Sequence, residues 1–120
     1  MARILVVDDS PTEIFSFKEI LERGGHEVIE AKSGEEGVKV AQKEMPDLVL
    51  MDIVMPGLNG FQATRQLTKN ASTEHIPVII VSTKDQETDR AWGERQGAKG
   101  YLTKPIEEAE LLKLIKESLK

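Results

Sequence analysis

The sequence contains no cysteine, which excludes disulfide bonds and thiolate metal sites. It also lacks any apolar run approaching the ~20 residues that a membrane helix needs. Lysine and arginine number 16 against 21 aspartates and glutamates, and the formal net charge is -5. Nucleic-acid-binding proteins usually carry a basic face, so this balance argues against DNA or RNA as a partner. We therefore expect partners that are neither nucleic acid nor membrane.

The composition that remains is typical of one globular domain over residues 1–120, with 39% apolar and 31% charged residues. A chain of this length can bury a core without disulfides or a structural metal. The first ten residues, MARILVVDDS, lack signal-peptide form because the apolar run is short and ends in two acidic residues. We expect a cytoplasmic, single-domain protein whose output acts through the surface of this domain.

Five short apolar runs punctuate the chain, and the segments between them have helical length and a 3.6-residue apolar period. The runs are RILVV (3–7), EVIEA (27–31), LVLM (48–51), VIIV (78–81) and GYL (100–102). Strands that alternate with helices predict a parallel sheet covered on both faces. Right-handed crossovers make this a doubly wound, five-stranded α/β fold.

Turn and capping residues mark the ends of the expected helices. The stretch Ser10–Glu13 predicts a helix start, with serine as N-cap, proline in the first turn and the Glu13 side chain reaching back in a capping box. This helix should end at Gly24-Gly25. The stretch Ser33–Glu36 repeats the capping-box pattern. Three more helices are expected, one after Asn59-Gly60, one from about Glu87 to Gln96 and one from about Glu107 to Leu119.

Polar residues follow four of the five expected strands. They are Asp8 and Asp9 after the first strand, Asp52 after the third, Ser82 and Thr83 after the fourth, and Lys104 and Pro105 after the fifth. In a doubly wound sheet the binding site lies outside the carboxyl ends of the strands. We therefore expect three carboxylates, two hydroxyls and one ammonium to meet at one edge of the sheet.

Such a cluster carries excess negative charge, because two like charges about 4 Å apart repel by about 4 kcal/mol at an effective dielectric constant near 20. A divalent cation would offset this repulsion. The available ligands are hard oxygens, which suit Mg²⁺ better than Zn²⁺ or Cu²⁺. A carboxylate beside Mg²⁺ and a lysine is also a plausible nucleophile toward a phosphoryl group, and Asp52 is the candidate.

In combination, these motifs resemble the receiver domain of bacterial response regulators across the whole chain. They are Asp8-Asp9, the stretch MDIVMPGLNG around Asp52, Ser82 and Lys104-Pro105. The resemblance implies a flavodoxin-like (βα)5 receiver fold with strand order 2-1-3-4-5. It also implies a phosphoacceptor with at most slow self-dephosphorylation rather than an enzyme. The stretches DDSPTE, GLNGFQATRQL and KDQETDRAWGERQGAKGYLTKP look like single-domain regulators of the chemotaxis-like system that controls type IV pili and twitching motility.

The resemblance assigns the phosphoacceptor and the metal ligands. Asp52 would accept the phosphoryl group from a histidine kinase in a Mg²⁺-dependent reaction. Asp9, Asp52 and the backbone carbonyl of Val54 would ligate Mg²⁺, and Asp8 would help through a water molecule. Lys104 would pair with the phosphoryl group, and its bond to Pro105 would be cis.

By the same resemblance, Ser82 would carry the switch by moving toward the phosphoryl group, and Tyr101 would be its rotating aromatic partner. The output surface would consist of the fourth helix, the fifth strand and the fifth helix, near Trp92, Lys99, Tyr101 and Leu112. Two alternatives stay open from the residues alone. Tyr101 fits simple packing nearly as well as a switch, and Trp92 fits either the core or a partner-binding face.

The sequence departs from the common family pattern at several positions. Ser82 stands where threonine is more frequent, and it keeps the hydroxyl while losing a methyl group. Thr83 is branched where many members have alanine. Val54 and Lys84 occupy variable positions that tune loss of the phosphoryl group, and Val54 offers no side-chain hydrogen bond to an attacking water.

Two other function classes compete with a signalling module. A small Mg²⁺-dependent phosphohydrolase could use Asp52 as nucleophile, but many such enzymes place an acid/base aspartate where this chain has Val54, and they carry a substrate-binding cap. A flavodoxin-like cofactor binder needs a phosphate-cradling loop after the first strand, where DDSPTE would repel a phosphate unless a metal intervened.

Overall fold

Five strands alternate with five helices in the computed structural model, which describes residues 1–120. In chain order they are β1 (Arg3–Val7), α1 (Pro11–Arg23), β2 (Glu27–Ala31), α2 (Gly34–Glu44), β3 (Leu48–Met51), α3 (Gly60–Lys69), β4 (Val78–Ser82), α4 (Glu87–Arg95), β5 (Gly100–Thr103) and α5 (Glu108–Ser118). All five expected strands and all five expected helices are therefore present, with boundaries that differ by a residue or two.

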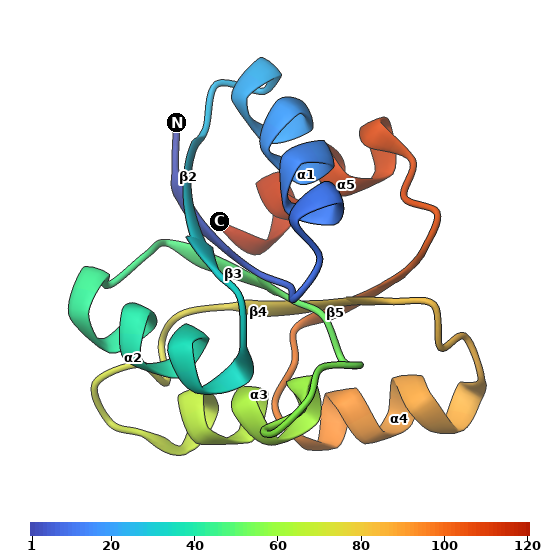
Figure 1. Ribbon diagram of the computed structural model, residues 1–120. Coiled ribbons are helices and arrows are strands. Elements are labelled where there is room, and N and C mark those ends of the chain that lie inside the picture. The colour runs from blue at the N-terminus through green and yellow to red at the C-terminus, as the bar shows by residue number, and fades with distance from the viewer.

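The strands form one parallel sheet in the order β2-β1-β3-β4-β5. Helices α1 and α5 cover one face, and α2, α3 and α4 cover the other (Figure 1). The predicted doubly wound fold and strand order are confirmed. The order reverses direction between β1 and β3, which is the point where such sheets place their binding sites.

The core consists of two apolar layers, one on each face of the sheet. Along β1, Ile4 and Val6 belong to the layer under α1 and α5, whereas Leu5 and Val7 belong to the layer under α2 and α3. This alternation follows from the two-residue period of a strand, and it explains why the strand is apolar throughout. None of the helices combines the length and apolarity needed to cross a bilayer.

The serine caps are confirmed, but the two predicted capping boxes are wrong. Ser10 and Ser33 each accept a hydrogen bond from the backbone N–H three residues later. The Glu13 carboxylate does not return to Ser10, because it binds Lys104 instead. The Glu36 carboxylate accepts from the backbone N–H of Lys32 rather than from that of Ser33.

The loop after β3 is held against the start of α3 by a close backbone approach at Gly60. Its N–H donates to the carbonyl of Ile53 at 3.0 Å. A Cβ atom at this position would lie 2.0 Å from the carbonyl oxygen of Asp52, so a side chain cannot be accommodated without moving backbone. Asn59 and Gln62 cap the helix through a reciprocal pair of hydrogen bonds. These contacts position the segment that carries Asp52.

Candidate functional site

The polar residues expected at the strand ends gather at the carboxyl edge of the sheet. Asp8 follows β1, Asp52 follows β3, and Lys104 follows β5, while Ser82 is the last residue of β4. Asp8, Asp52 and Ser82 are buried, with 2%, 9% and 0% of their surface exposed. Asp9 is exposed. Two of the three carboxylates at this edge, those of Asp8 and Asp52, are therefore largely shielded from water.

Asp8, Asp9 and Asp52 form a candidate metal site, because one carboxylate oxygen from each lies within 4.8 Å of the others. Three carboxylates fit the oxygen preference of Mg²⁺, which is commonly held by one or two protein carboxylates together with water. The carbonyl of Val54 accepts no backbone hydrogen bond, and this residue is 58% exposed. The residues present thus fit a magnesium ion that keeps several waters.

Lys104 is bound by acidic side chains from helix α1 and from the loops after β1 and β3. Its Nζ lies 2.8 Å from Glu13, 3.1 Å from Asp8 and 3.6 Å from Asp52. Burial works against the charged ammonium, but the hydrogen bond to Glu13 and the negative charges of Asp52 and Asp8 outweigh it and raise the pKa of Lys104. The ammonium is therefore fixed at the site and remains charged at neutral pH.

The carboxyl group of Asp52 is destabilised in its charged form. Burial is the main cause, and the negative charge of Asp8 adds to it, so that the pKa of Asp52 is raised from 3.8 to about 6. The positive charge of Lys104 opposes this shift without cancelling it. Bound Mg²⁺ would favour the ionised carboxylate, because a cation beside a carboxyl group lowers its pKa.

The hydroxyl and aromatic residues named from the sequence lie beside one another at the ends of β4 and β5. Ser82 Oγ accepts from the backbone N–H of Lys84 at 3.2 Å. The Tyr101 hydroxyl donates to the carbonyl of Lys84 at 2.6 Å. The same short segment, Ser82–Lys84, therefore connects both side chains. Thr83, which lies between Ser82 and Lys84 in the sequence, is exposed.

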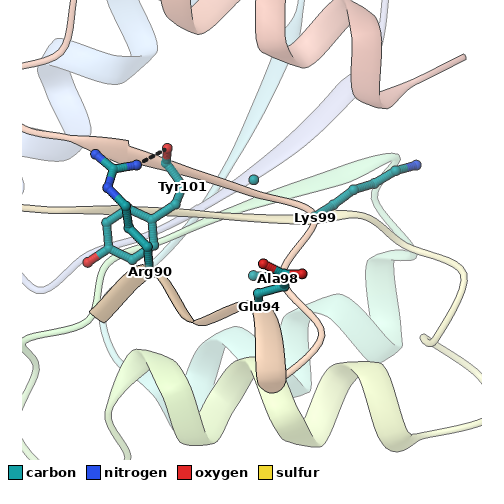
Figure 2. A pocket seen from close by; sticks show the side chains of 6 residues that line it. Arg90, Glu94, Ala98, Lys99 and Tyr101 are labelled. Carbon is teal, nitrogen blue, oxygen red and sulfur yellow. Dashed lines mark hydrogen bonds between the residues drawn. The ribbon is translucent and has the colours of Figure 1, made fainter. Parts of the chain in front are cut away.

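Tyr101 also lines a cavity of about 280 Å³ between α4 and β5 (Figure 2). The guanidinium of Arg90 lies over its ring, 5.0 Å from the centroid, and donates to its carbonyl at 3.4 Å. Glu94 and Lys99 complete the polar part of the lining. Trp92 of α4 is 47% exposed, which excludes the core and leaves the surface position as the remaining one of the two alternatives.

Leu112 was expected near this surface, but the structure places it elsewhere. It packs beside Gly24 and lines a different cavity with His26. Since Leu112 faces the end of α1 rather than β5, the expectation that groups it with Tyr101 is wrong.

The expected cis bond between Lys104 and Pro105 is present. The sequence interpretation missed Glu13 as a partner of Lys104, and the only available signal was its position one helical turn after the Asp8-Asp9 pair.

Comparison with known proteins identifies the family to which this geometry belongs. The model of the response regulator receiver domain matches residues 4–116. The chain belongs to the response regulator receiver family. The match spans all ten elements almost entirely, including every residue of the candidate site.

Individual relatives agree with this assignment over nearly their whole length. The chain is 67% identical over 115 residues to Protein PilH of Pseudomonas aeruginosa, covering 96% of this chain and 95% of that protein. It is 32% identical to the polar-differentiation response regulator DivK of Brucella ovis, over 97% and 94% of the two chains. Among solved structures, the chemotaxis protein CheY4 of Vibrio cholerae superimposes with a TM-score of 0.92 at 30% identity, over 99% of both chains.

Proposed function

We propose that this receiver domain accepts a phosphoryl group on Asp52 from a histidine kinase, in a reaction that depends on Mg²⁺. The observation that carries the proposal is the position of Asp52 with a lysine ammonium 3.6 Å away and two further carboxylates within 4.8 Å. A cation and a metal-binding cluster beside the acceptor are what transfer of a phosphoryl group to a carboxylate requires.

In the proposed reaction, a carboxylate oxygen of Asp52 attacks the phosphorus atom and forms an O–P bond. The bond from phosphorus to the donor breaks, and its electron pair stays on the leaving atom, a histidine nitrogen of a kinase or an acetate oxygen of acetyl phosphate. Lys104 stabilises the negative charge on the phosphoryl oxygens from its place beside Asp52. Asp9, Asp52 and the Val54 carbonyl would hold Mg²⁺, with Asp8 helping through a water molecule, and the bound ion would supply further charge neutralisation.

Ser82 is the proposed switch residue. Its Oγ accepts the Lys84 N–H, which leaves its own O–H available to donate to a phosphoryl oxygen on Asp52. A movement of Ser82 toward that oxygen would pull on Lys84, whose carbonyl holds the Tyr101 hydroxyl. The displacement of Lys84 and Tyr101 would reach the surface formed by α4, β5 and α5, which we propose as the face that binds a target protein.

The wider role proposed here rests on the likeness to PilH and on the sequence resemblance described above. We propose a cytoplasmic regulator whose receiver domain spans residues 1–120, acting in a chemotaxis-like system that controls type IV pili and twitching motility. In this role the protein is a phosphoacceptor and is not a turnover enzyme. The Val54 side chain supports this distinction, since an exposed aliphatic group offers no acid or base at the position two residues after Asp52.

Intact-mass measurement tests the proposal against the competing phosphohydrolase. Wild-type protein is incubated with acetyl phosphate and Mg²⁺, with Asp52→Asn as the matched variant. The wild type should gain one phosphoryl group and the variant none. In a parallel incubation with a generic phosphomonoester and Mg²⁺, release of many phosphates per protein would favour the phosphohydrolase instead. Labelling of Asp52→Asn equal to that of the wild type would refute Asp52 as the acceptor.

A further inference from the structure

Glu13 makes the shortest ion pair at the site, although neither the family resemblance nor the proposed reaction gives it a role. Its Oε1 lies 2.8 Å from Nζ of Lys104, closer than the carboxylate of Asp8 at 3.1 Å or that of Asp52 at 3.6 Å. Among the causes that raise the pKa of Lys104 against the effect of burial, the hydrogen bond to Glu13 is the largest. Glu13 is therefore a close ion-pair partner of this lysine in the unphosphorylated protein, beside Asp8, which accepts a hydrogen bond from the same ammonium.

The contact is not a by-product of helix capping. The N-cap bond from the Glu13 N–H goes to Ser10 Oγ, and the Ser10 N–H is already taken by Asp8 Oδ1 at 2.9 Å. The Glu13 carboxylate is thus released from the capping box that its position predicts. It turns across from α1 to the loop after β5, where it lines a cavity of about 190 Å³ together with Lys104 and Ile106.

The carboxylates that contact Lys104 differ in the free-energy cost of losing its ammonium. An ammonium has three N–H donors, and a phosphoryl group on Asp52 would need at least one of them. Asp8 has a side chain that is only 3% exposed, so losing Lys104 would leave a buried charge with one partner fewer. The Glu13 side chain is 40% exposed, and water can replace the ammonium there at lower cost.

We propose that Glu13 is a positioning residue that holds Lys104 in the unphosphorylated protein and must release it when a phosphoryl group arrives on Asp52. This inference rests on the proposed phosphorylation of Asp52. Glu13 acts through Lys104 and touches neither the phosphoryl donor nor the acceptor. Competition between the Glu13 carboxylate and the phosphoryl oxygens for one ammonium sets how readily the domain is phosphorylated.

Removing the charge of Glu13 should change Mg²⁺ affinity and the rate of phosphorylation in opposite directions. The negative charge of Glu13 offsets the positive charge of Lys104, which reduces repulsion of Mg²⁺ and also reduces attraction of an anionic phosphodonor. Removing the charge should therefore weaken Mg²⁺ binding while making phosphorylation faster once Mg²⁺ is saturating. A purely structural defect would instead impair both properties together.

The test compares Glu13→Gln with wild-type protein and with Glu22→Gln, which removes the same charge from an exposed position on the same helix. Mg²⁺ affinity is measured by titration calorimetry. The rate of phosphorylation by acetyl phosphate at saturating Mg²⁺ is measured from the time course of intact mass. For Glu13→Gln we expect Mg²⁺ affinity to fall and the rate to rise, each by about two- to fivefold, the range of a partly exposed ion pair. Glu22→Gln should match the wild type, and Glu13→Asp should lie between the wild type and Glu13→Gln in both measurements.

The possible failures are distinguishable. If the wild type takes up no phosphoryl group, the proposed function fails, and this inference fails with it. If the wild type is labelled but Glu13→Gln is labelled at an equal or slower rate, only the role of Glu13 is overturned. An equal rise in rate for Glu22→Gln would also overturn it, because the effect would then reflect net charge rather than the contact with Lys104.

Discussion

The ammonium nitrogen of Lys104 lies 3.6 Å from Oδ1 of Asp52, although the two residues follow strands that are not neighbours in the sheet. Strand β4 lies between β3 and β5, so the two side chains meet above its end, where Ser82 is buried. The parallel strand order thus brings a carboxylate, a cation and a hydroxyl to one place.

Asp52→Asn should stabilise the metal-free protein at neutral pH. The pKa of Asp52 is about 6 in the folded protein against 3.8 for an unperturbed group, so the folded state binds this proton more tightly. Protonation therefore favours the folded state fully below about pH 4, and this benefit is lost as the pH rises through 6. Urea unfolding in EDTA at pH 7.5 should show a gain of about 1–3 kcal/mol for Asp52→Asn.

The pH dependence isolates this contribution from the other charges that face Asp52, which are those of Asp8, Asp9 and Lys104. The difference in unfolding free energy between the two proteins should shrink as the pH is lowered from 7.5 to 4.5. A difference that stays constant over this range would mean that Asp52 does not titrate there.

Asp9→Asn should weaken Mg²⁺ binding by about tenfold or more, because it removes one full ligand charge from the cluster of Asp8, Asp9 and Asp52. Asp9 is the exposed member of the cluster, so the change should leave the fold intact. Titration calorimetry measures the affinity, and Asp47→Asn, at the opposite edge of the sheet, serves as the control. An unchanged affinity in Asp9→Asn would refute the metal assignment.

Ser82→Ala should uncouple the phosphoryl site from α4. Beryllofluoride, a mimic of the phosphoryl group, should change the fluorescence of the half-exposed Trp92 in the wild type and much less in Ser82→Ala. A charge-assisted hydrogen bond is worth about 1.5–3 kcal/mol, enough to change the ratio of two states by tenfold or more. Ser82→Thr keeps the hydroxyl and should respond like the wild type. Equal responses in wild type and Ser82→Ala would exclude the proposed relay.

Gly60→Ala should destabilise the protein by about 1–3 kcal/mol, since the added Cβ would lie 2.0 Å from the carbonyl oxygen of Asp52. The displaced segment carries Asp52, so phosphorylation by acetyl phosphate should slow as well. Urea unfolding measures the first effect and intact mass the second. Gln66→Ala, at an exposed position of α3, is the matched control. Gly60→Ala with wild-type stability would show that the loop can move freely.

The fold could be predicted because local patterns and global topology agree in this chain. Apolar runs such as LVLM at β3 mark buried parallel strands, and the polar residues at their ends must then share one edge. The placement of Asp8, Asp52, Ser82 and Lys104 followed from that argument without knowledge of any side-chain contact.

What the sequence could not predict were choices between competing partners. Glu13 has the position of a capping residue, but its carboxylate instead pairs with Lys104, a lysine distant in the sequence. Leu112 could face either β5 or the end of α1 from its place on α5, and in the structure it packs beside Gly24 at the end of α1. Such contacts depend on how helices are oriented on the sheet, which the period of apolar residues does not specify.

The central claim is that Asp52 carries the phosphoryl group, and reductive trapping tests it most directly. An acyl phosphate on an aspartate is reduced by borohydride, which releases phosphate and converts that residue to homoserine. After incubation with acetyl phosphate and Mg²⁺, peptide mass spectrometry should find homoserine at position 52 and at no other aspartate. Homoserine at position 8 or 9, or none at all in protein that has gained a phosphoryl group, would contradict the account.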